Sequence, residues 1–213
     1  GLGDVYKRQV PRIKYAVAGM ENIEDFWNVD VMFATAHFHD VVISKEGQTE
    51  GVKQLLKVYY QGRELDIDQN EIFHRCKIAM PTDEKRNMMN ASSNYDIITS
   101  IIDAVREGGS RKIFSPGVFG EIGGYPVRID ATGDALAAYI DTSVFSLEEM
   151  REANRRSIAL DGVENVENGK LIYTDALVQK VADAFDVELP KTVNFEEIDI
   201  VAKYIIDNII IPP

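Results

Sequence analysis

The sequence contains very little cysteine and no long apolar run. Its one cysteine, Cys76, cannot form an internal disulfide, and this favours a reducing, cytoplasmic location. No apolar run is long enough to cross a bilayer, so we expect no membrane partner. Basic residues are also scarce, since 23 Lys and Arg stand against 35 Asp and Glu and give a net charge of −12. Nucleic-acid binding needs a clustered basic surface, so this balance argues against a nucleic-acid partner.

Several well-known catalytic signatures are absent as well. The most glycine-rich stretch leads into a strand, whereas the glycines of a dinucleotide-binding fingerprint lead into a helix. There is no Gly-Lys-Ser/Thr phosphate loop and no Gly-x-Ser-x-Gly nucleophile turn. The remaining composition, 45% apolar and 27% charged over 213 residues, is typical of a globular protein with a substantial core.

The first nine residues differ in character from the rest. They are mostly polar, contain two glycines and resemble assembly or adapter sequence at the ends of metagenomic translations. We therefore expect residues 1–9 to be foreign and disordered. We expect residues 10–213 to form a single α/β domain. The chain is then expected to be the C-terminal part of a longer enzyme.

Strand-like and helix-like segments alternate through residues 29–115. This β-α-β-α-β order predicts an α/β fold of two or three layers, with a mixed sheet that is parallel in this portion and C-terminal helices beyond it. The predicted strands are 29–36, 72–80 and 112–115, and the predicted helices are 48–60 and a segment from Ser93 or Asn94 to Gly108-Gly109.

The last third carries clear local signals. Ser146–Glu149 and Asn194–Glu197 are capping boxes, which predict helices to about residues 159 and 209. Asn168-Gly169 predicts a hairpin turn between two short strands. Thr174 or Asp175 is expected to cap a helix that ends at Phe185.

The glycine-rich stretch from Ser115 to Asp130 is the leading candidate for a binding site. Its backbone N–H groups could meet an anionic group, and an arginine beyond it could hold a carboxylate through two parallel hydrogen bonds. The alternative is a structural corner between two strands, with glycines for close packing. The candidate substrate-binding residues are Ser115, Gly117, Gly120, Gly123, Gly124, Tyr125 and Arg128.

Two further groups of polar residues follow predicted strands. His37 and His39 are candidate catalytic or substrate-binding histidines at the end of the first strand. With His74 they form the alternative of a divalent-metal site, although His74 begins its strand while the other two end theirs. Asn90, Ser93 and Asn94 precede or begin a predicted helix, where free N–H groups could bind an anion.

These observations lead to three hypotheses about function. The first is a cytoplasmic metabolic enzyme acting on a small anionic metabolite, best described as a nicotinamide-dependent oxidoreductase using NAD(P), whose nucleotide unit would lie upstream. The second is a metal-assisted hydrolase or lyase that uses the three histidines. The third is a non-catalytic ligand-binding or oligomerisation module, in which the chain forms a homo-oligomer.

Overall fold

The computed structural model describes residues 2–34, 55–69, 71–72, 75, 84–133 and 135–210. Of residues 2–9, 84–87, 89 and 90 it describes the backbone only. The chain divides into two compact units, Gly1–Ser157 and Ile158–Pro213. That residues 10–213 form a single domain stays a prediction.

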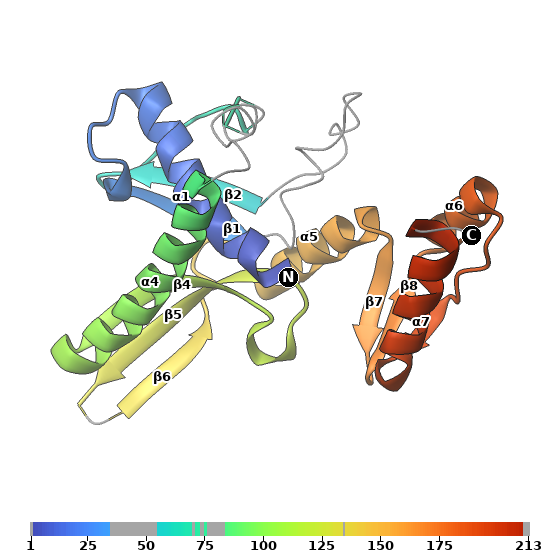
Figure 1. The fold of residues 1–213 in the computed structure, drawn as a ribbon. Coiled ribbons are helices and arrows are strands. Elements are labelled where there is room, and N and C mark those ends of the chain that lie inside the picture. Colours follow the sequence, from blue (N-terminus) through green and yellow to red (C-terminus); the bar gives the residue numbers. More distant parts are fainter. Residues whose placement is uncertain are drawn as a thin grey trace. The chain divides into compact units, whose positions relative to one another are not determined.

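In its described residues the first unit has three long helices and two small sheets, and Figure 1 shows their arrangement. Its helices are α1 (Leu2–Glu21), α4 (Glu84–Glu107) and α5 (Leu147–Leu160), and the last of these crosses the boundary between the units. Its strands are β1 (Val29–Ala34), β2 (Leu55–Tyr60), β3 (Arg63–Glu64), β4 (Gly109–Pro116), β5 (Gly124–Thr132) and β6 (Ala135–Ile140), with short 3-10 turns at Phe26–Asn28 and Val118–Gly120.

The expected parallel β-α-β-α-β sheet is wrong. The described strands form three separate three-stranded sheets, ordered β1-β2-β3, β4-β5-β6 and β7-β8-β9, and every pairing in them is antiparallel. The main error lies in the segment predicted as a helix over 48–60, because Leu55–Tyr60 is strand β2, paired with β1 from Val29 to Ala34. Residues 48–54 lie outside the described part of the chain.

A second error concerns the strand predicted over 72–80. Ile72 and Arg75 have helical backbone, and the Ile72 amide donates to the Asp68 carbonyl over 3.1 Å. The rest of that prediction lies outside the described residues. Helix α1 also runs through residues 2–9, where we expected disorder; whether these residues are foreign stays a prediction.

Other local predictions are confirmed. Strand β1 lies within the predicted 29–36 segment, and β4 and β5 contain the predicted strands on either side of the glycine loop. Helix α4 ends where expected, because Gly108 and Gly109 both adopt positive φ just beyond it. The Ser146 and Glu149 side chains form the expected capping box at the start of α5.

The core of this unit lies where α1 and α4 cover the sheets. Helix α1 packs on β1 and β4 and also contacts α4. Its buried residues Val10, Ile13 and Val17 recur at helical spacing and join the β1 residues Val29 and Val31 in one cluster. A second cluster joins Ala104 of α4 to β4 and β5, so α4 covers part of the β4-β5-β6 sheet.

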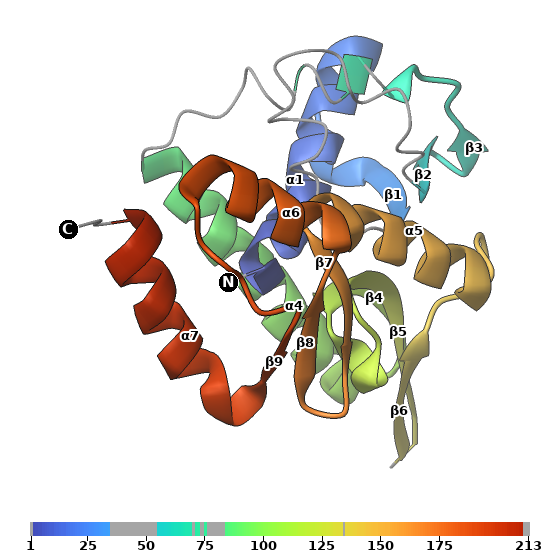
Figure 2. The same cartoon turned by 90° about the vertical axis from the view of Figure 1, so that its right-hand side faces the viewer.

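The second unit is smaller (Figure 2). Strands β7 (Val163–Glu167), β8 (Lys170–Tyr173) and β9 (Thr192–Asn194) accompany α6 (Asp175–Phe185) and α7 (Ile198–Ile205), which continues as one π-helical turn to Ile210. The predicted hairpin is confirmed, since Asn168 and Gly169 both have positive φ between β7 and β8. Thr174 caps α6 by accepting a hydrogen bond from the Leu177 amide, as expected.

Candidate functional site

The glycine-rich stretch is the connection of a β-hairpin. Strands β4 and β5 pair antiparallel up to Pro116 and Gly124. The Gly117 amide then donates to the Gly123 carbonyl over 2.9 Å and closes the loop at its base. Residues 117–123 are therefore a compact hairpin loop, which is the structural-corner alternative raised by the sequence.

Asn154 of α5 holds the base of this loop. Its amide oxygen accepts from the Gly124 amide (3.0 Å), and its amide nitrogen donates to the Gly124 carbonyl (3.1 Å) and the Met150 carbonyl (3.0 Å). Asn154 is only 1% exposed. A Cβ on Gly123, where φ is +98°, would lie 2.1 Å from the Asn154 side-chain oxygen, so this position requires glycine.

A salt bridge fixes the middle of the loop to α5. Arg151 donates to Glu121 through both Nε and Nη2, with an Nε–Oε2 distance of 3.0 Å. This pairing lowers the pKa of Glu121. Tyr125, which begins the buried part of β5, is 1% exposed and donates from its hydroxyl to the Ile122 carbonyl, while burial raises its pKa. The loop is thus anchored at several points.

Phe119 is the exception within this anchored loop. Its ring is 64% exposed and its φ is +55°, a left-handed conformation that is uncommon for an aromatic residue. Strained and exposed positions on an otherwise rigid loop are often functional. Phe119 was not among the residues selected from the sequence, because nothing local distinguishes it from a core phenylalanine.

Arg128 is engaged by a buried carboxylate. Its guanidinium donates to Asp141 over 2.7 Å and to the Ser110 hydroxyl over 3.3 Å. Asp141 is 3% exposed and also accepts from the Ser143 amide. Burial acts to raise the pKa of Asp141, but the hydrogen bonds from Ser143 and Arg128 outweigh it and lower the pKa. Because Arg128 is neutralised within the fold, its predicted grip on a substrate carboxylate gains no support from this geometry.

Among the described residues, the other predicted site residues lie on helix α4 and on strand β4. Helix α4 begins at Glu84, so Ser93 and Asn94 lie inside it and not at its N-terminus, and the helix start expected there is wrong. Ser93 is buried and Asn94 is exposed; the Asn90 side chain is not described. Ser115 lies half-buried on β4 opposite Tyr125. The three histidines, His37, His39 and His74, lie outside the described residues.

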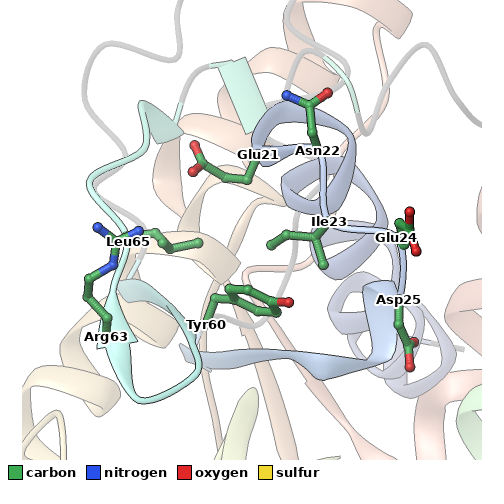
Figure 3. A pocket seen from close by; sticks show the side chains of 8 residues that line it. All are labelled: Glu21, Asn22, Ile23, Glu24, Asp25, Tyr60, Arg63 and Leu65. Carbon is green, nitrogen blue, oxygen red and sulfur yellow. The ribbon is translucent and has the colours of Figure 1, made fainter.

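A pocket of about 540 Å³ lies at the end of α1, beside β2 and β3. Figure 3 shows Ile23 and Tyr60 pointing toward one another across it. Its charged lining consists of three carboxylates and one guanidinium, so its net charge is negative and it does not suit the small anionic metabolite that we predicted. The lining residues are Glu21, Asn22, Ile23, Glu24, Asp25, Tyr60, Arg63 and Leu65.

Helix α4 has a second apolar face that is exposed among the described residues. Ala104 is fully buried and Ile97 packs beside it, but the residues on the other side of the helix are exposed. They follow the alternating three- and four-residue spacing of a helix–helix seam. The exposed seam consists of Met88, Ala91, Tyr95, Ile98, Ile102 and Val105, with Ile101 beside it.

This seam points away from α1. Asp96 interacts electrostatically with Lys14 of α1 and therefore marks the side of α4 that faces α1; burial raises the Asp96 pKa and lowers that of Lys14. At 100° per residue, Ile98 and Val105 lie roughly opposite Asp96 on the helix. Since α1 packs over β4, these side chains are directed toward the β6 side of the sheet.

Strand β6 is the exposed edge of that sheet. Within the part of the chain that the structure describes, it pairs with β5 on one side only, and five of its residues, Ala135 to Tyr139, are exposed. The strand carries no charge and no proline, the features that usually protect an edge from pairing with another chain. Leu136 and Ala138 lie opposite Ala131 and Ile129, which pack in the cluster with α4, so they share the face of the sheet that α4 covers. We call the α4 seam and this edge together the α4–β6 surface.

Comparisons with family models, curated proteins and solved structures found no match for this chain. Within the described ranges, no three His, Cys, Asp or Glu residues are placed to hold a metal ion. No helix in the same ranges is long and apolar enough to cross a membrane.

Proposed function

We propose that the Gly1–Ser157 unit is an assembly module that joins two copies of this chain through the α4–β6 surface. The observation that carries the proposal is the uncovered seam of α4, whose residues Tyr95, Ile98 and Val105 are 70%, 56% and 61% exposed. A contiguous apolar helix face on a folded unit indicates an interaction site. This develops the oligomerisation alternative from the sequence.

The charge distribution favours a second copy as the occupant. Two chains that each carry a net charge of −12 repel at long range. Along the middle of the seam the flanking positions Ser92, Asn94 and Thr99 are uncharged, as is the whole of β6. The charge at the C-terminal end of the seam, Arg106, is positive and opposes the net negative charge of the chain. A two-fold interface places the same patch on both sides, and this patch is apolar and neutral enough to meet itself.

Single acidic substitutions on the seam test the proposal. Ile98→Asp and Val105→Asp would place a charge at the interface from both copies, so each should raise the dimer dissociation constant at least tenfold, equivalent to about 1.4 kcal/mol. The measurement is sedimentation equilibrium over a range of protein concentrations. Tyr15→Asp on α1 is the matched control, because Tyr15 is similarly exposed (59%) but lies outside the surface. Equal effects of all three variants would refute the assignment.

A second candidate is an enzyme acting on a small anionic metabolite near the 117–123 loop. The observation in its favour is Phe119, exposed and left-handed on a loop that Asn154 and Arg151 otherwise fix. The nicotinamide-dependent form of this idea, with NAD(P), additionally requires a nucleotide-binding unit upstream of the chain. The metal-dependent form depends on histidines outside the described residues. Titration of carboxylate and phosphate metabolites, compared between the natural chain and Phe119→Ala, tests the candidate; no binding by either chain would refute it.

A further inference from the structure

Resting on the proposed dimer, we propose that β6 pairs antiparallel with β6 of a second copy, centred on Ala138, to make one continuous six-stranded sheet. The direction of the backbone groups of β6 points to this register. The Asp141 amide donates to the Pro126 carbonyl over 2.9 Å, so Asp141 turns its amide toward β5. Residue pairs along an antiparallel ladder alternate between hydrogen-bonded and non-hydrogen-bonded pairs. Pro126 and Asp141 continue the register of β5 and β6 as a hydrogen-bonded pair.

It follows that alternate residues of β6 face the open edge. Tyr139 and Ala137 turn their N–H and C=O groups toward β5, as Asp141 does. Leu136, Ala138 and Ile140 turn theirs away from β5 and toward the exposed edge, where a further strand could bond them. An antiparallel strand from a second copy supplies such a partner in a regular pattern.

Centring the two-fold axis on Ala138 satisfies all of these groups. Ala138 then lies opposite its own symmetry mate, and Leu136 lies opposite Ile140 of the second copy, so every outward-facing residue of the strand is paired. On the other face of the sheet, Ala137 lies opposite Tyr139, so a small side chain meets a large one. A register centred on Ala137 would instead carry Ile140 past the end of the partner strand.

The same arrangement places the apolar seams of the two copies on one face of the joined sheet. Leu136 and Ala138 share the face of the sheet on which α4 packs. Extending the sheet across the two-fold axis brings the two copies of α4 to the same face, with Ile98 and Val105 of each directed toward the axis.

Engineered cysteines test the register. In a Cys76→Ser background, which removes the one natural thiol, Ala138→Cys places two Cα atoms about 5.5 Å apart across the axis, within the range of a disulfide. We expect mild oxidation to convert most of this variant to covalent dimer. Ala135→Cys is the matched control, because its two copies would be about 20 Å apart, given the rise of about 3.3 Å per residue. Cross-linking through Ala137→Cys in preference to Ala138→Cys, or equal cross-linking at all positions, would overturn the register.

A pair of proline variants tests the same claim through the backbone. Ala138→Pro removes an N–H that faces the open edge, so it should abolish the dimer while the chain stays folded. Ala137→Pro removes an N–H bonded to β5 and should destabilise the unit itself. Dimers that survive Ala138→Pro but dissociate with Ile98→Asp would show that α4 alone joins the copies; this result would overturn the strand pairing and leave the proposed function standing.

Discussion

Replacing Gly123 with alanine tests how the hairpin loop is held. The new Cβ would lie 2.1 Å from the Asn154 side-chain oxygen and 2.3 Å from its Cγ, distances at which something must move. Asn154 cannot move without giving up its hydrogen bonds to the buried Gly124 backbone. Each buried group left without a partner costs about 1–3 kcal/mol, and an alanine at positive φ costs about 1–2 kcal/mol more. With both Gly124 backbone groups affected, we expect Gly123→Ala to lower the free energy of unfolding by roughly 3–8 kcal/mol.

Gly120→Ala is the matched control for this experiment. Gly120 has a similar positive φ of +81°, but nothing lies within 4 Å of its Cβ position. This variant should lose only the conformational part, about 1–2 kcal/mol. The assay is urea unfolding followed by fluorescence of Trp27, the one tryptophan of the sequence, which lies in the first unit. All variants are compared at one protein concentration, because dimerisation adds to stability. Equal losses for Gly120→Ala and Gly123→Ala would refute the role given to Asn154.

Two further substitutions test other contacts. Asp141→Asn leaves Arg128 without its carboxylate and should cost about 2–3 kcal/mol in the same assay. Because the pKa of Asp141 is lowered in the folded state, the stability that Asp141 contributes is present above its ordinary pKa of 3.8 and is lost as the pH falls below that value. The stability of the variant should therefore depend less on acid pH than that of the natural chain, and parallel curves would contradict this. Gly162→Ala places a Cβ 2.5 Å from Leu177 Cδ2 in the second unit, so it should shift the unfolding seen by circular dichroism and leave the Trp27 fluorescence transition unchanged. Gly169→Ala, which has open space at its Cβ position, should have a smaller effect. A change in the Trp27 transition would show that the two units do not unfold independently.

Elements with local signals could be predicted from the sequence. The capping box at Ser146, the Asn168-Gly169 turn and the paired glycines after Glu107 each act through neighbouring residues, so the chain itself specifies them. The prediction over 48–60 was wrong because Leu55, Leu56 and Tyr59 match helical spacing as well as a strand. Only the pairing of Leu55–Tyr60 with β1, a tertiary interaction, decides between the two.

The site was less predictable for the same reason. Strand β6 was missed because its alanines have low strand propensity, and pairing with β5 overrides that preference. The role of Asn154 was missed, since its partner Gly124 lies far away in the sequence. The apolar stripe of α4 was visible from its isoleucines, but periodicity cannot show that Ile97 is packed while Ile98 is left uncovered.

The molar mass of the unaltered chain in solution tests the central claim most directly. Sedimentation equilibrium at neutral pH and moderate salt, over a wide range of protein concentrations, distinguishes one 23.9 kDa chain from two. The α4–β6 surface predicts a reversible equilibrium that reaches twice the chain mass, with Ile98→Asp shifting it toward the single chain and Tyr15→Asp leaving it in place. A single-chain mass at every concentration would contradict the proposal that this surface joins two copies.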